Sequence, residues 1–221
     1  MTELAARLDW GLLPAVPVPF RGAGIDQEAQ AGYIRWMATQ PVAGVAVWAH
    51  TGRGPHLSQA QRSLVLDAWR RGLPGDVIVA GVNTPEMAVA AAEGGADALL
   101  AFPRAVNPVT YHRDLARLRP VIAFYLYERA GGVAYDDATL HAILDLPGVL
   151  GIKVATLDAL PTYARIAAIV RAHPGKLLIT GEDRFLNESL VLGARAALIG
   201  MGAALSDVQA ALLRAHAAHD A

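Results

Sequence analysis

The chain has 221 residues and no cysteine, which excludes disulfide bonds and thiolate metal sites. Only 18% of the residues are charged and 54% are hydrophobic, so we expect much of the chain to be buried, some of it between subunits. The net charge of −1 and the lack of a basic stripe make nucleic acid and anionic membranes poor candidates as partners.

The N-terminus carries an early acidic residue, Glu3, and lacks the basic and apolar segments of a signal peptide. No apolar run approaches the ~18 residues that a membrane span needs. We therefore expect a cytoplasmic protein. No linker or low-complexity segment divides the chain, so residues 1–221 are expected to form a single domain.

Eight short apolar runs recur along the chain. They are rich in Val, Leu, Ile and Ala without clean alternation, which is typical of parallel strands that are buried on both faces. The runs span residues 12–20, 44–49, 76–82, 96–102, 120–127, 149–155, 176–182 and 196–201.

Helical patterns lie between and after these runs, and Asp26, Ser58 and the Thr84-Pro85 pair suit the starts of the first three. The predicted helices span residues 26–37, 59–69, 85–94, 110–118, 136–144, 157–172, 185–192 and 206–216. Eight β-then-α units in a chain of this length predict an α/β fold, a (β/α)8 TIM barrel. A doubly wound open sheet is the alternative, which the absence of GxGxxG and GxxxxGK[ST] motifs disfavours.

The strand at residues 149–155 carries Lys153 near its middle. Only two of the 19 Lys and Arg residues are lysines, Lys153 and Lys176, so this chain uses arginine wherever a positive charge alone is needed. Arginine does not act as a nucleophile, whereas a desolvated lysine does. Lys153 therefore suggests a Schiff base with a carbonyl substrate, the alternative being a lysine that extends to solvent. Lys176 precedes the seventh strand and is expected to be a solvated turn residue on the opposite face.

The active site of a TIM barrel lies at the C-terminal ends of its strands. Several polar residues fall at or just beyond those ends: His50, Thr51, Arg53, Asn83, Arg104, Tyr127, Arg129, Lys153, Thr156, Glu182 and Asp183. The remaining histidines show no HxH or HExxH spacing, so we expect no metal site.

Three segments resemble motifs of the dihydrodipicolinate synthase / N-acetylneuraminate lyase family of class I aldolases and dehydratases. Residues 13–20 with 24–26 are similar to its opening T-P-F … G-x-I-D, and residues 151–156 resemble the G-I-K-E-A/S strand of the Schiff-base lysine. Residues 180–183, Thr-Gly-Glu-Asp, are similar to the S-G-D-D turn after strand seven. The resemblance implies that Lys153 forms a covalent imine without a cofactor or metal, and that Gly181 contacts the substrate.

The family has its proton-shuttling tyrosine in strand five, where this chain has Tyr125 and Tyr127. Tyr127-Glu128-Arg129 resembles the Y-N-R motif of the branch that dehydrates keto-deoxy sugar acids. Alternation along a strand predicts that both tyrosines point the same way, and Tyr127 lies nearer the C-terminal rim. We therefore expect Tyr127 to be catalytic, with a core tyrosine as the alternative, and Arg129 to contact a distal hydroxyl or acid.

The turn after strand two reads G-T-T-G-E in the family and Ala-His-Thr-Gly-Arg at residues 49–53 here. Thr51 and Gly52 match, so a hydroxyl and backbone N–H groups are expected to hold the carboxylate of an oxo acid. His50 replaces the first threonine, and a general base, a substrate hydrogen-bond donor and a structural histidine are all consistent with it.

Two features depart from the family. Residues 102–105 lack the tyrosine pair after strand four, one of which reaches a neighbouring subunit's site. The chain also ends soon after the eighth predicted helix, so we expect the family's C-terminal helical extension to be missing. Dihydrodipicolinate synthesis itself is therefore not expected. We expect a homo-oligomer, a dimer or a tetramer.

The sequence predicts a Schiff-base lyase, an aldolase or a dehydratase, that acts on pyruvate or a longer 2-oxo acid such as a keto-deoxy sugar acid. One alternative is a catalytically impaired barrel of the same family that still binds a 2-oxo acid. The other is a metal-dependent or phosphate-binding barrel that uses Gly200-Met201-Gly202 together with Glu182 and Asp183.

Overall fold

The computed structural model describes residues 2–157 and 159–220. Eight parallel strands form one sheet in the order β1-β10-β9-β8-β7-β6-β5-β4. They are β1 (Gly11–Pro14), β4 (Gly44–Val47), β5 (Val77–Val82), β6 (Ala98–Ala101), β7 (Val121–Leu126), β8 (Val149–Ala155), β9 (Leu177–Thr180) and β10 (Ala196–Ile199). Ala15 bridges to Ala46, and the Val16 N–H donates to the Ala46 carbonyl at 3.1 Å, so β1 meets β4 and the sheet closes.

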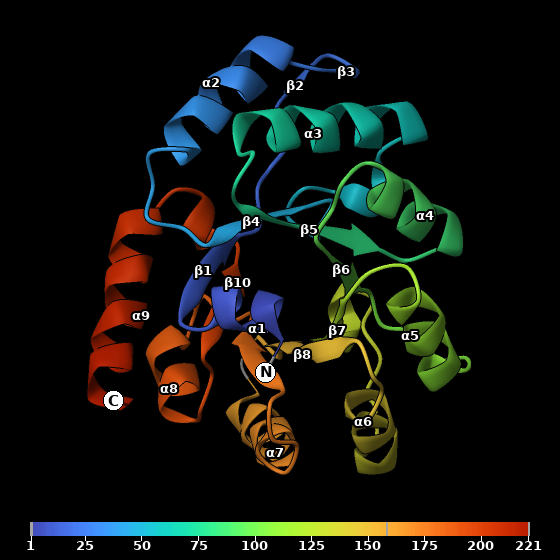
Figure 1. Ribbon diagram of the computed structural model, residues 1–221, viewed down its shortest axis with the longest axis vertical. Helices are drawn as coiled ribbons and strands as arrows, with labels where there is room; N and C mark the ends of the chain where they lie inside the picture. The colour runs from blue at the N-terminus through green and yellow to red at the C-terminus, as the bar shows by residue number, and fades with distance from the viewer. Residues whose placement is uncertain (1, 158, 221) are drawn as a thin grey trace.

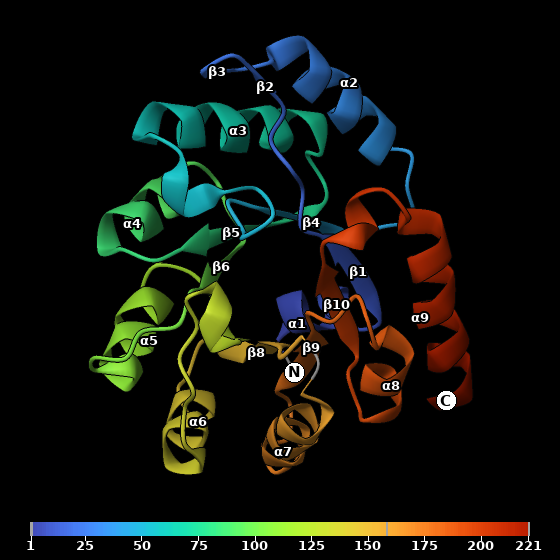
Figure 2. The ribbon, with the colours of Figure 1, turned by 180° about the vertical axis from the view of Figure 1, so that it is seen from behind.

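One helix follows each barrel strand and lies outside it (Figures 1 and 2). These helices are α2 (Gln27–Met37), α3 (Gln59–Gly72), α4 (Pro85–Glu93), α5 (Pro108–Ala116), α6 (Asp137–Leu144), α7 (Leu160–Arg171), α8 (Leu186–Val191) and α9 (Ser206–Asp220). The prediction of a (β/α)8 TIM barrel is confirmed. Within the described ranges, no helix combines the length and the apolar content that a membrane span requires.

Local sequence signals set several helix ends. Asp26 accepts a hydrogen bond from the Ala29 N–H at 3.1 Å, and Ser58 and Gln61 form a capping box at the start of α3. Thr84 caps α4, where Pro85 occupies the first turn. The sequence did not predict the hairpin of β2 (Phe20–Arg21) and β3 (Gly24–Ile25), nor the 3₁₀ turns η1 (Gly54–His56), η2 (Glu128–Ala130) and η3 (Met201–Ala203).

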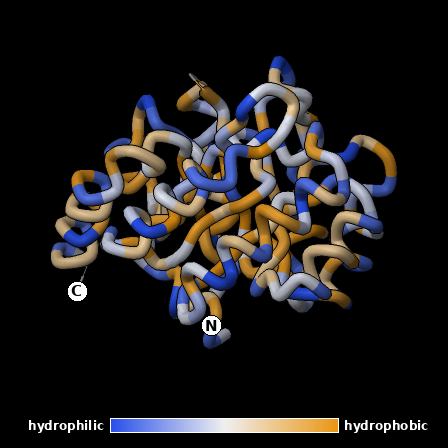
Figure 3. The backbone as a smooth tube through the Cα atoms, turned by 90° about the horizontal axis from the view of Figure 1, so that it is seen from above, coloured by the Kyte–Doolittle hydropathy of each residue, from blue (hydrophilic) through white to orange (hydrophobic). Residues whose placement is uncertain are grey.

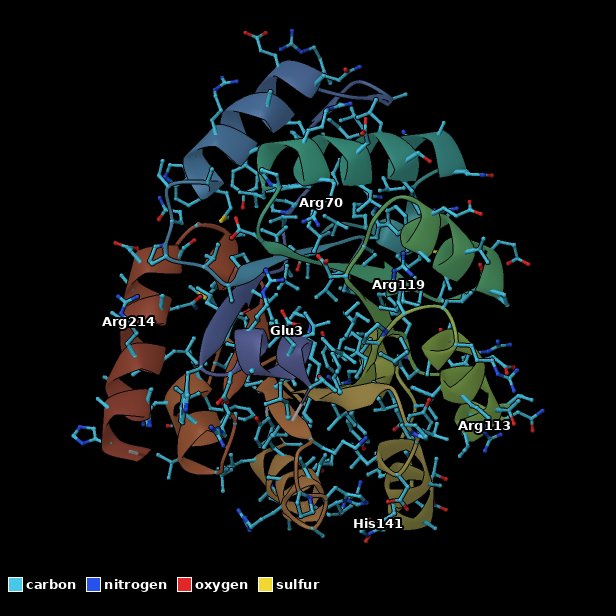
Figure 4. The ribbon with its side chains drawn as sticks, viewed as in Figure 1. Glu3, Arg70, Arg113, Arg119, His141 and Arg214 are labelled. Atoms are coloured by element: carbon cyan, nitrogen blue, oxygen red, sulfur yellow. The ribbon has the colours of Figure 1, made fainter. Side chains whose placement is uncertain are left out.

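The strands divide their side chains between two apolar layers, and Figure 3 shows apolar segments gathered in the middle of the molecule. The outer layer lies between strands and helices. The inner layer fills the barrel and includes Leu13, Ala46, Val79, Leu100, Phe124, Ile179 and Leu198. Ala5 and Leu8 of an unpredicted helix, α1 (Glu3–Leu8), join this inner layer. Figure 4 shows Glu3 of α1 over the middle of the barrel, so α1 closes the end opposite the C-terminal rim.

We expect Leu8→Ala to lower the free energy of unfolding by about 2–5 kcal/mol, because it truncates a fully buried side chain of α1, the helix that closes this end of the barrel. Urea denaturation measures the change. Leu205→Ala is the control, since Leu205 is 42% exposed and its truncation is expected to cost less than about 1 kcal/mol. If Leu8→Ala lowered the free energy of unfolding by no more than this small amount, α1 would not stabilise the barrel.

An extra residue in β8 lets Val149 and Lys153, which lie four positions apart, face opposite layers. Val121 of β7 pairs with Val149, but the next residue, Ile122, pairs with Gly151, which leaves Leu150 as the additional residue of a bulge. Val149 packs in the outer layer and Leu150 in the inner one.

Alternation resumes after the bulge. Ile152 and Val154 pack in the outer layer, and Ala155 packs in the inner layer together with Leu150. Lys153 therefore projects into the barrel. Gly151 is needed at this point because a Cβ there would lie 2.0 Å from the Leu177 carbonyl oxygen of β9.

Candidate active site

A cavity of about 190 Å³ lies at the C-terminal ends of the barrel strands. Its walls come from the ends of β7 and β8 and from the turns after β4, β8, β9 and β10. The lining residues are His50, Thr51, Phe124, Leu126, Tyr127, Lys153, Ala155, Leu157, Gly181, Glu182, Asp183, Arg184 and Gly200. Five of the predicted site residues meet here: Lys153, Tyr127, His50, Thr51 and Gly181. Gly52 and Arg129 do not line the cavity.

Lys153 is only 6% exposed, and its Nζ lies 4.3 Å from the centroid of the Phe124 ring. Burial lowers the pKa of the amine to about 8, while the charges of Asp183 and Glu182 act in the opposite direction. A useful fraction of the amine is therefore neutral near pH 7 to 8. Arg129, which is exposed on η2, is not among the causes of this shift, and desolvation is the main one.

Gly181 leaves room for the lysine side chain. Its N–H donates to the Val154 carbonyl at 2.7 Å, which fixes the turn after β9 against β8. A Cβ at this position would lie 2.7 Å from Lys153 Cε. The contact of Gly181 is thus with the side chain of Lys153.

Tyr125, in β7, and Tyr127, just after its end, face different layers. Tyr125 is buried in the outer layer and packs edge-on against Tyr135, with ring centroids 6.5 Å apart. Tyr127 is half-buried, packs against the inner layer and lines the cavity. The expectation that both point the same way is wrong, because β7 ends at Leu126 and the backbone turns into η2, so the alternation stops before Tyr127.

The turn after β4 brings two of its predicted residues to the cavity. His50 and Thr51 are exposed at its mouth, and Gly52 is buried behind them. The Arg53 N–H donates to the His50 carbonyl at 3.0 Å, and Arg53 itself takes a left-handed backbone conformation before η1. The hydroxyl of Thr51 is thus presented on the same cavity as the amine of Lys153.

The two carboxylates of the turn after β9 have different partners. Glu182 is 2% exposed and accepts hydrogen bonds on Oε1 from the Thr156 backbone N–H and, at 3.0 Å, from the Thr156 hydroxyl. Burial raises the pKa of Glu182, and the hydrogen bonds from Thr156 and the charge of Lys153 partly offset this. Asp183 accepts from the backbone N–H groups of Gly200 and Met201 at 3.1 and 3.0 Å. These amides are therefore engaged internally, which disfavours a phosphate cradle at this turn.

Among the cavity residues that lie in the turns after the strands, the sequence missed Leu157 and Arg184. Leu157 takes a positive φ of 68° after β8, which no motif indicated. Arg184 is exposed at the cavity and directly follows the predicted Thr-Gly-Glu-Asp turn. The signal that could have identified Arg184 is its position, because it directly follows Asp183 just beyond the end of β9.

No family model matches the chain, but individual proteins do. A 4-hydroxy-tetrahydrodipicolinate synthase from Synechococcus sp. (strain WH7803) is 30% identical over 200 residues, which cover 83% of this chain and 65% of that protein. An N-acetylneuraminate lyase from Citrobacter koseri is 26% identical over 200 residues, which cover 83% of this chain and 66% of that protein. The chain thus spans about two thirds of the length of these curated relatives.

Solved structures share the fold. YagE of E. coli K12, a prophage protein of the dihydrodipicolinic acid synthase family in complex with pyruvate, has a TM-score of 0.84 at 23% identity and covers 95% of this chain and 76% of its own. A monomeric dihydrodipicolinate synthase variant has a TM-score of 0.88 at 17% identity, covering 100% of this chain and 78% of its own. The fold, the sequence relatives and the strand that carries Lys153 agree: the chain belongs to the dihydrodipicolinate synthase / N-acetylneuraminate lyase family.

Proposed function

We propose that the protein is a Schiff-base-forming lyase that acts on pyruvate or a longer 2-oxo acid such as a keto-deoxy sugar acid. One observation carries this proposal: the amine of Lys153, with a pKa of about 8, is buried in the barrel at a cavity that a hydroxyl-bearing side chain also lines. The names of the relatives, a synthase and a lyase, and the pyruvate bound to YagE support the choice of substrate class.

The neutral amine of Lys153 attacks C2 of the 2-oxo acid. A nitrogen–carbon bond forms, and the carbonyl oxygen takes up two protons and leaves as water, which gives a protonated imine. The imine withdraws electrons from C3. Either the C4 hydroxyl loses its proton and the C3–C4 bond breaks to give an aldehyde and an enamine, as in an aldolase, or C3 loses a proton and the C4 hydroxyl takes up a proton and departs as water, as in a dehydratase.

The cavity residues are assigned roles in this reaction. The Tyr127 hydroxyl relays protons, together with His50 or a water molecule. Thr51 and neighbouring backbone N–H groups hold the substrate carboxylate. Because Arg129 does not line the cavity, we assign the contact with a distal hydroxyl or acid to Arg184, which does. We also propose that the protein works as a cytoplasmic homo-oligomer, a dimer or a tetramer, in keeping with its low charged fraction of 18%.

Incubation with pyruvate and sodium borohydride, followed by mass analysis of the protein and its peptides, tests the proposal. We expect one reduced pyruvate group per chain, attached to Lys153. No adduct with pyruvate or any of a panel of longer 2-oxo acids would overturn the proposal. An adduct without turnover of keto-deoxy sugar acids would favour the catalytically impaired barrel instead.

We expect Tyr127→Phe to lower turnover, or the exchange of the C3 protons of pyruvate with solvent, by about 10²–10⁴-fold, because it removes the group that moves the proton. NMR in D₂O measures the exchange. Tyr125→Phe is a matched control two residues away, and it is expected to exchange at close to the parent rate because Tyr125 faces the outer layer. Equal rates for Tyr127→Phe and the parent protein would assign the proton transfer to another group.

A further inference from the structure

The carboxylate of Glu182 is buried at the same cavity as the amine of Lys153, and Thr156 holds it in place from one side. Thr156 follows the lysine strand, and its N–H and hydroxyl both donate to Oε1 of Glu182. The Glu182 N–H in turn donates to the Thr180 hydroxyl at 3.1 Å. These contacts tie the turn after β9 to the end of β8, three residues beyond Lys153.

The side chains of Glu182 and Lys153 share the same small space. Both line the 190 Å³ cavity, and the residue before Glu182, Gly181, packs against Cε of Lys153. Their charges act on each other: the carboxylate favours the charged amine, and the amine favours the charged carboxylate. Asp183 acts more strongly than Glu182 on the pKa of the amine, but it is less buried and both of its oxygens cap the Gly200 and Met201 amides. Glu182 is therefore the buried carboxylate that is held by the residue directly after the strand of the lysine.

A protonated imine needs such a partner. The reaction proposed above depends on the imine being positively charged, because only then does it withdraw electrons from C3. A buried positive charge is costly unless an opposite charge lies near it. A fixed carboxylate that is already desolvated and held by two donors supplies that charge without reorganising during the reaction.

We propose that Glu182, held by Thr156, is a positioning residue that serves as the counter-ion of the protonated imine on Lys153. The inference rests on the proposed function, because it assigns a partner to the imine which that function requires. Two effects follow. The carboxylate raises the pKa of the free amine, and it keeps the imine protonated over a wider pH range, so it favours loss of the C3 proton.

Glu182→Gln tests this, because the amide oxygen still accepts from Thr156 while the charge is lost. The first measurement is the pH dependence of borohydride trapping with pyruvate. Removing a negative charge lowers the pKa of the amine, so we expect the midpoint to move down by about half a unit or more. The second is C3 proton exchange of pyruvate in D₂O, which we expect to slow about tenfold or more. A purely structural brace would leave both unchanged, since the hydrogen bonds remain.

The other titratable or charged groups that face the pair are His50, Tyr127, Asp183, Arg184 and, on α7, Tyr163. They are the same in the parent protein and in the variant, so the shift reports the charge at position 182. Thr156→Val provides a second test that keeps this charge. Without the Thr156 hydroxyl, Glu182 should protonate at higher pH. The rate of C3 exchange should therefore begin to fall at a higher pH than in the parent protein.

The outcomes separate the two proposals. If the parent protein forms no adduct, the proposed function fails. If the parent forms the adduct but Glu182→Gln has the parent's midpoint and exchange rate, the counter-ion role is overturned and the lyase proposal stands. If Glu182→Gln does not fold, Thr156→Val decides. An unchanged pH profile of C3 exchange in Thr156→Val overturns the counter-ion role, and an exchange rate that begins to fall at higher pH supports it.

Discussion

Lys153→Arg is expected to abolish the borohydride-trapped pyruvate adduct, with a loss of more than ~10³-fold relative to the parent protein. Arginine keeps the positive charge and much of the side-chain length, but it has no neutral amine to attack C2. The measurement is the intact mass after trapping, followed by peptide mapping. Because arginine keeps the charge and most of the packing, loss of the adduct in this variant reports the loss of the nucleophilic amine.

Lys176→Arg is the matched control, because Lys176 is the chain's other lysine. It lies at the opposite end of the barrel and donates to the carbonyls of Leu146 and Val149 at 3.1 and 2.7 Å. This corrects the expectation of a solvated turn lysine: Lys176 is half-buried and joins two turns. We expect the Lys176→Arg variant to form the adduct normally. An adduct that survives in Lys153→Arg and disappears in Lys176→Arg would refute a nucleophile at the C-terminal rim.

Gly181→Ala is expected to slow adduct formation by about 10²-fold or more, although Lys153 is unchanged. The added Cβ would lie 2.7 Å from Lys153 Cε, 2.9 Å from the Val154 carbonyl oxygen and 3.0 Å from Ala155 Cβ. The Val154 carbonyl and Ala155 Cβ are fixed to the backbone of the closed barrel, so the flexible side chain of Lys153 has to move. A displacement of about 1 Å at a reacting group slows a reaction by this amount. Rapid-quench trapping gives the rate.

The control for this variant is Gly75→Ala, where an added Cβ meets nothing within 4 Å. We expect it to trap pyruvate at the parent rate. Circular dichroism and urea denaturation of both variants verify that the barrel is folded. A parent-like trapping rate in Gly181→Ala would mean that the amine reaches the substrate without the space that this glycine provides.

Much of the fold could be predicted because its signals are local. Strands buried on both faces appear as apolar runs, and β8 was predicted with its observed bounds. The predicted first strand ran to residue 20, but β1 ends at Pro14 because Pro14, Pro17 and Pro19 lack the N–H groups that a central strand donates. Helix α1 was missed because its six residues give too short a pattern to show a period.

The candidate site was harder to predict where it depends on contacts between turns. Lys153 stood out by the rarity of lysine and by its place in a strand. The partnership of Glu182 with Thr156 joins residues 26 positions apart, and no spacing rule indicates it. Arg129 and Arg184 both follow strand ends, and only the path of the backbone after β7 and β9 decides which of them lines the cavity.

The chemistry depends on the register of β8 as well as on side-chain identity. Deleting Leu150 would remove the bulge but leave Gly151 paired with Ile122 and Lys153 with Phe124, so the amine would still face the barrel interior. One residue inserted between Gly151 and Lys153 would instead place Lys153 opposite Tyr125, which faces the outer layer, and would turn the amine toward the helices. The strand can therefore lose one residue before Lys153, but it cannot gain one, without moving the amine out of the cavity.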